Sequence, residues 1–168
     1  MSDDDHEPVS LRSGWTARLL SELPQPQQEQ PEIVAAVDVL AKVVGAVDAH
    51  SWVDASAPND EVVIYVLSLG LLYRLSATAR SSVRHLHEPD GGIVKVVRWT
   101  IRPDDEYLLS IEYSDRPPGR PVTKHKWSFT LDRQKEKLSV EAEVDEPGDA
   151  FALQLAREID RLRRSEGA

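Results

Sequence analysis

The sequence predicts an α+β fold, in which a four-stranded antiparallel sheet of two consecutive hairpins packs on two or three helices. Residues 93–144 alternate apolar and polar side chains, a pattern typical of strands that bury one face. Residues 32–49 and the chain after Pro147 repeat apolar residues at intervals of three and four, which indicates helices. No alternating βαβ units occur, which argues against Rossmann and barrel folds.

The composition predicts one domain with a tail. The chain has 168 residues and no cysteine, which excludes disulfides, zinc–thiolate sites, iron–sulfur clusters and thiol catalysis. The acidic start MSDDDHEPVS has no apolar run, so we expect no secretory signal. No apolar stretch is long enough to span a membrane. We therefore expect a soluble, cytoplasmic protein.

Residues 1–31 are predicted to form a flexible acidic arm, and residues 32–166 a single α+β domain. Within the arm, Leu11, Trp15 and Leu19 follow one another at every fourth residue and form an apolar stripe on a short helix. So short a helix needs a surface to become ordered. Residues 10–21 are therefore predicted to act as a docking segment, either on another chain or on the protein's own domain. Proline and glutamine in residues 24–31 form a tether.

The next three stretches of the chain are predicted to be a helix, a loop and a second helix. A helix over residues 32–49 would bury Ile33, Val37, Leu40, Val44 and Val47. Residues 51–58 read as a loop, with Trp52 at the edge of the core. Residues 59–87 keep helical spacing over a length that exceeds a normal strand, so a helix is predicted. The β-branched start EVVIYV leaves one alternative, which is a strand at 61–67 and a helix from about residue 70.

Two hairpins follow. The first pairs residues 93–102 with 107–114 through a turn at 103–106, and places Ile101 opposite Tyr107 and Trp99 opposite Leu109. The second turns at 132–137. It pairs Leu131 with Leu138, Phe129 with Val140 and Lys126 with Glu143. The predicted buried face comprises Trp99, Tyr107, Leu109, Ile111, Trp127, Phe129, Leu131 and Val140.

The last helix is predicted to begin near Asp149, which can serve as its N-cap. Its apolar stripe is Ala152, Leu155, Ile159 and Leu162.

No stretch carries a motif for catalysis. His85 and His87 would lie about 200° apart on a helix and could not share a metal ion. Gly91-Gly92 lacks the pattern of a phosphate-binding loop, and no serine stands in a GxSxG motif. We therefore expect no catalytic residues, no metal and no cofactor.

The charge pattern argues against nucleic acid as a ligand. The net charge is −9, and such a field repels phosphate backbones. The basic excess in residues 116–137, which includes Lys124 and Lys126, is either a contact surface or a solvated strand face.

These observations favour a non-enzymatic protein–protein interaction module, such as an adaptor, a regulator, a chaperone-like protein or an immunity-type partner. The partner is another protein, and a second copy of the chain is one candidate. The predicted binding residues are Leu11, Trp15, Leu19, Lys124 and Lys126. The alternative is a small enzyme or ligand-binding domain with a pocket between helices and sheet.

Overall fold

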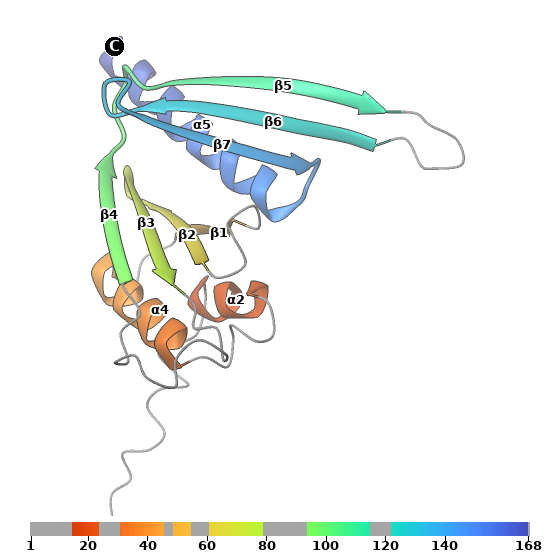
Figure 1. The fold of residues 1–168 in the computed structure, drawn as a ribbon. Helices are drawn as coiled ribbons and strands as arrows, with labels where there is room; N and C mark the ends of the chain where they lie inside the picture. Colours follow the sequence, from red (N-terminus) through yellow and green to blue (C-terminus); the bar gives the residue numbers. More distant parts are fainter. Residues whose placement is uncertain are drawn as a thin grey trace, which may run out of the picture. The chain divides into compact units, whose positions relative to one another are not determined.

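The structure is a computed structural model, and it describes residues 15–23, 31–45, 49–54, 61–78, 94–114 and 122–167. These ranges contain the helices α2 (Trp15–Glu22), α4 (Pro31–Val44) and α5 (Pro147–Glu166) (Figure 1). Strands β1 (His50–Val53), β2 (Glu61–Ser68), β3 (Leu71–Thr78) and β4 (Val94–Thr100) form one sheet in this order. Strands β5 (Glu106–Ser114), β6 (Val122–Leu131) and β7 (Glu136–Glu143) form a second sheet. The α+β class with a four-stranded antiparallel sheet is confirmed.

The chain divides into two compact units. The first comprises Met1–Ser68 and Tyr73–Val97, and the second comprises Leu69–Leu72 and Arg98–Ala168. Within the described ranges, no helix is both long enough and apolar enough to cross a membrane.

In the first unit, the helix predicted over residues 32–49 is present as α4, but it ends at Val44; it buries Ile33, Val37 and Leu40, whereas Val44 is half-buried and Val47 lies outside the described residues. Gly45 follows the helix, and its positive φ of 86° suits a residue without a Cβ. The amide of Gly45 donates to the carbonyl of Ala41 at 2.9 Å.

The short helix of the predicted arm is α2, and it packs against α4 and β1. Leu19 has no exposed surface and Leu23 is also buried. Leu11 lies outside the described residues, and for Trp15 the structure describes only the backbone. Leu19 therefore lies inside the chain's own first unit, which is one of the two alternatives that the sequence left open.

The helix predicted over residues 59–87 is wrong for residues 61–78, and the rest of that range lies outside the described residues. Residues 61–78 form the hairpin β2–β3, so the alternative was right about the strand and wrong about the following helix. Leu69 and Gly70 form its two-residue turn with φ of 51° and 75°, as in turns that match the twist of paired strands. The β-branched residues of β2 outweighed the helical spacing, because tertiary burial overrides a weak periodic pattern. Residues 51–53 are likewise strand β1 and not a loop.

The first predicted hairpin is also wrong. β4 belongs to the first sheet, where it lies beside β3, and β5 pairs with β6 instead. The chain leaves β4 at Ile101, whose amide donates to the Gly70 carbonyl at 2.9 Å. Pro103 and its neighbours therefore connect two sheets, although their turn residues suggested a hairpin. Trp99 is half-buried in the first sheet and does not contribute to the predicted buried face of the second.

The second predicted hairpin exists as β6–β7, but its register is displaced by two residues. Phe129 faces Leu138, Trp127 faces Val140 and Lys126 faces Glu141. The turn is shorter than predicted, since strand β7 already begins at Glu136. A shift of two residues preserves the faces of a strand, and the burial of Trp127, Phe129, Leu131 and Val140 is confirmed.

Helix α5 covers the apolar face of the second sheet (Figure 1). The predicted stripe is confirmed, because Ala152, Leu155 and Ile159 are buried and Leu162 is half-buried. Its N-cap is Glu146 and not Asp149. Near its end, the Tyr107 hydroxyl donates to Asp160 Oδ2 at 2.7 Å. The Arg163 guanidinium donates to the carbonyls of Pro103 and Asp105.

Candidate functional site

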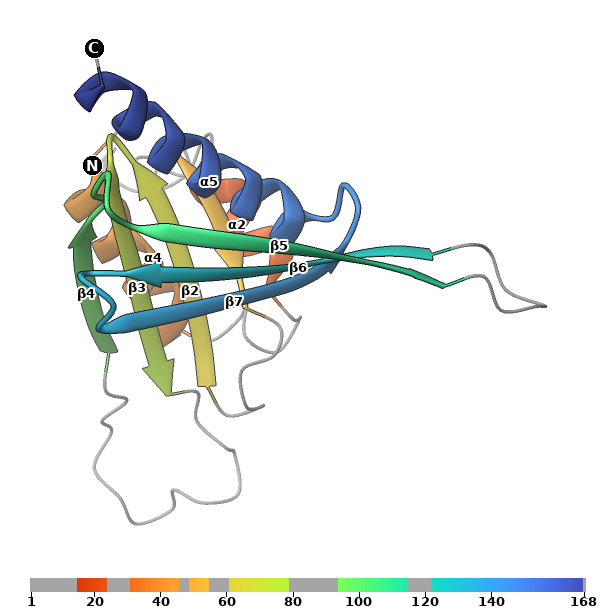
Figure 2. The same cartoon turned by 90° about the horizontal axis from the view of Figure 1, so that it is seen from above.

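Strand β5 exposes large apolar side chains on both of its faces. Leu108 is 65 % exposed, Ile111 63 % and Tyr113 65 %. The strand lies at one edge of the three-stranded sheet. The β5–β6 hairpin extends beyond β7 and the start of α5 (Figures 1 and 2). Apolar side chains gathered on one exposed strand are typical of a protein-binding surface.

The course of α5 explains why the second half of β5 is uncovered. The helix starts over β6, where Asp149 contacts Trp127, and ends over the beginning of β5, where Asp160 contacts Tyr107. It therefore crosses the sheet diagonally, and Ile111 and Tyr113 lie outside its path. The predicted burial of Ile111 is wrong for this reason. Tyr107 and Leu109 are half-buried.

The other face of the sheet, which carries Leu108, is polar. On this polar face Lys126 Nζ lies 2.8 Å from Glu112 Oε1, and Lys124 Nζ lies 2.7 Å from Glu141 Oε1. The hydrogen bonds that Lys124 donates to Glu141 and Lys126 donates to Glu112 raise the pKa values of the two lysines. Such exposed pairs add little stability. They do balance the charge of this face, so the lysines are not an isolated basic patch.

The pairing of β6 with β7 determines which backbone groups of β5 point toward β6 and which point outward. Val144 donates to the Thr123 carbonyl at 3.2 Å, so the odd-numbered residues of β6 direct their backbone groups toward β7. In antiparallel pairs this direction alternates along a strand, and the even-numbered residues of β6 therefore face β5. Ser110 pairs with Lys126, so the even-numbered residues of β5 bond to β6. The odd-numbered residues direct their N–H and C=O groups outward.

This outward row is Tyr107, Leu109, Ile111 and Tyr113. At its beginning, the carbonyl of Asp105 already accepts a hydrogen bond from Arg163. No strand of the described ranges lies beyond β5 in its sheet. Backbone groups arranged in this way can pair with an added strand.

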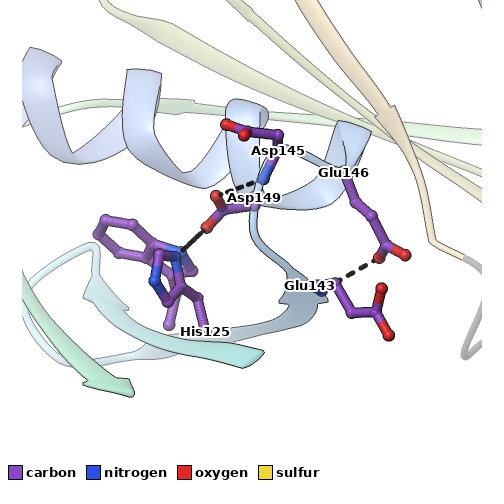
Figure 3. A network of polar contacts seen from close by, with 6 residues as sticks. His125, Glu143, Asp145, Glu146 and Asp149 are labelled. Carbon is purple, nitrogen blue, oxygen red and sulfur yellow. Dashed lines mark hydrogen bonds and ion pairs between the residues drawn. The ribbon is translucent and has the colours of Figure 1, made fainter. Parts of the chain in front are cut away.

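A second arrangement of polar groups lies at the start of α5 (Figure 3). Trp127 Nε1 donates to Asp149 Oδ1 at 2.8 Å, and His125 Nδ1 lies 2.8 Å from the same oxygen. The amide of Asp145 donates to Asp149 Oδ2 at 3.2 Å. In the same β7–α5 turn, the amide of Glu143 donates to Glu146 Oε2 at 3.1 Å.

The Asp149 carboxylate is held by these donors and has little exposure to solvent. Burial raises the pKa of Asp149, but the hydrogen bonds from Trp127, His125 and the Asp145 amide outweigh it and lower the pKa below its usual value. A carboxylate paired with an imidazole can orient a general base. Here Oδ1 of Asp149 contacts two side chains of β6, and Oδ2 accepts from the backbone of the β7–α5 turn. The carboxylate thus connects these two segments, and we interpret the network as structural.

Replacing Asp149 by Asn should remove a pH dependence of stability. The carboxyl has a lower pKa when folded than its unfolded value of about 3.9. Around these pKa values the folded chain therefore binds fewer protons than the unfolded chain. The stabilisation by the charged Asp149 carboxylate is fully present above the unfolded pKa, and it is lost as the pH falls through the folded pKa. We expect Asp149→Asn to cost about 1–3 kcal/mol at pH 7 and less at pH 2–3. Urea titrations across this range measure the difference.

Glu146→Gln is the control, because Glu146 carries the same charge, lies close to Asp149 at the start of α5 and is exposed. An equal loss of stability by Asp149→Asn at pH 7 and at low pH would contradict the role of the charged carboxylate.

The structure separates the residues predicted for binding. Leu19 is buried in the first unit, whereas Lys124 and Lys126 lie on the polar face of the second sheet. The sequence reasoning missed Leu108 and Tyr113 as exposed residues. Consecutive apolar residues at Leu108 and Leu109 were the available signal, since neighbouring residues of a strand point to opposite faces.

His85 and His87 lie outside the described residues. Within the described part of the chain, no group of three or more histidine, aspartate or glutamate side chains is arranged to hold a metal ion. No family model, no curated protein and no solved structure matches the chain.

Proposed function

We propose that the chain is a protein-interaction module, and that strand β5 binds an extended segment of its partner. The exposure of Leu108, Ile111 and Tyr113 on one edge strand carries this proposal. An added strand would pair with the outward backbone groups, which supply affinity that does not depend on sequence. The apolar side chains beside the pairing edge would select the residues of the partner.

The charges around β5 favour a partner with few charged residues in the segment that binds. Ile111 and Tyr113 lie on the apolar face, and on the polar face Glu112 is already paired with Lys126. A charged side chain opposite Ile111 would lose water without gaining an ion pair. In the proposed partner segment, every second residue is therefore apolar, and these residues lie on the same face of the sheet as Ile111 and Tyr113.

Ile111→Lys should weaken partner binding with little effect on folding. The side chain is largely exposed, so the folded chain tolerates the charge. In a complex the lysine would be buried against an apolar side chain, and we expect binding to weaken at least about tenfold. Affinity capture from the native host with the wild type and the variant as parallel baits, followed by mass spectrometry, measures the loss.

Val43→Lys is a matched control, because Val43 is 53 % exposed but lies on α4 in the first unit. Proteins recovered by the wild type and by Val43→Lys, but depleted with Ile111→Lys, bind through β5. If all three baits recover the same proteins in equal amounts, β5 is not the binding surface.

A further inference from the structure

We propose that the strand which occupies the edge of β5 is the β5 of a second copy of the chain. This inference rests on the proposed function of β5 as a strand-binding edge, and it names the partner. The two strands would run antiparallel about a two-fold axis at Ser110, and the two sheets would become one continuous sheet of six strands.

The sequence of β5 is self-complementary about Ser110. The two-fold axis places Leu109 opposite Ile111 of the second copy, and Tyr107 opposite Tyr113 of the second copy. These four residues are the outward row, so each of their pairs can exchange two backbone hydrogen bonds. Their side chains share the apolar face, where apolar and aromatic cross-strand pairs stabilise antiparallel strands.

The charges of β5 select this register. With the axis at Ser110, Glu112 faces Leu108 of the second copy and Glu106 faces Ser114 of the second copy. An axis at Leu109 would place Glu106 opposite Glu112 of the second copy twice, and like charges directly opposite are destabilising. An axis at Ile111 would leave Tyr107 outside the paired strands. Only the axis at Ser110 pairs the whole of Glu106–Ser114 with its copy.

Leu108 provides a test that is specific to this register, because it faces Glu112 of the second copy. Leu108→Lys would place two lysines opposite two glutamates, and Leu108→Glu would place two glutamates opposite two glutamates. Both variants remove the same exposed leucine. We expect the Kd for dimerisation of Leu108→Lys to be lower than that of Leu108→Glu by about tenfold. Sedimentation velocity of the full-length chain over a range of concentrations measures both constants.

The difference should shrink at high salt, because the contacts are exposed to solvent. A third variant, Ile111→Pro, removes an outward N–H group without removing a hydrogen bond to β6. It should be monomeric, and circular dichroism checks that it is folded. If Ile111→Pro is misfolded, the Leu108 pair alone decides.

Two results would overturn the proposal. One is a wild-type chain that stays monomeric at every concentration, and the other is an equal Kd for Leu108→Lys and Leu108→Glu. If the chain is monomeric but Ile111→Lys still loses a different protein in the capture experiment, only the second copy is wrong and β5 remains a binding edge. Equal capture by all baits together with a monomeric chain contradicts both proposals.

Discussion

Truncating Phe129 to alanine should destabilise the second unit by about 3–5 kcal/mol. Phe129 is 1 % exposed. Its ring stacks on that of Trp127, with centroids 6.0 Å apart, and lies 6.2 Å from the ring of Tyr107. Leu138 faces it on β7. Because α5 covers this face, the missing ring would leave a cavity that the surrounding strands cannot close. A chemical denaturation titration measures the loss.

Leu108→Ala is the control for Phe129→Ala. It removes an apolar side chain from the neighbouring strand, but at a position that is 65 % exposed. The change should stay within about 0.5 kcal/mol at low protein concentration. A loss below about 1 kcal/mol for Phe129→Ala would contradict the burial of its ring.

Replacing Leu19 by alanine should destabilise the first unit by about 2–5 kcal/mol. Leu19 has no exposed surface, and its helix packs against α4 and β1. The predicted docking segment is thus part of the core of its own unit, and its removal leaves a cavity between helix and strand. Thermal unfolding of the purified chain should show a lower midpoint that does not depend on protein concentration.

Val39→Ala on α4 is the matched control, since Val39 is 49 % exposed and the helix tolerates alanine. The other alternative for the arm predicts a different result. If Leu19 docked on another chain, Leu19→Ala would leave the midpoint of a dilute sample unchanged and would reduce association.

The apolar periodicity of the sequence correctly predicted those elements that bury one face against a single neighbouring layer. The spacing of Ile33, Val37 and Leu40 predicted α4, and the stripe of Ala152, Leu155 and Ile159 predicted α5. The alternation of Trp127, Phe129 and Leu131 predicted which face of β6 is buried. In these elements the periodicity and the burial arise from the same contacts.

The same periodicity could not predict which strands pair with each other. The turn-like residues around Pro103 favoured a hairpin, but they connect the two sheets, and β5 pairs with β6 across a longer segment. Alternation gives the face of a strand and not its neighbour, because every amphipathic strand offers the same backbone groups to any partner. The helical spacing in residues 61–78 was a coincidence of apolar residues that strands β2 and β3 bury together.

The candidate site was decided by tertiary structure. From the sequence alone, Ile111 and Phe129 are equivalent members of an apolar alternation, yet one is 63 % exposed and the other 1 %. The difference comes from the diagonal path of α5 across the sheet. The hydrogen bond from Trp127 to Asp149 holds the beginning of the helix over β6, and the hydrogen bond from Tyr107 to Asp160 holds its last part over the start of β5. The sequence by itself determined that β5 has an apolar face, and only the packing of a helix from the end of the chain decided which part of that face stays exposed to solvent.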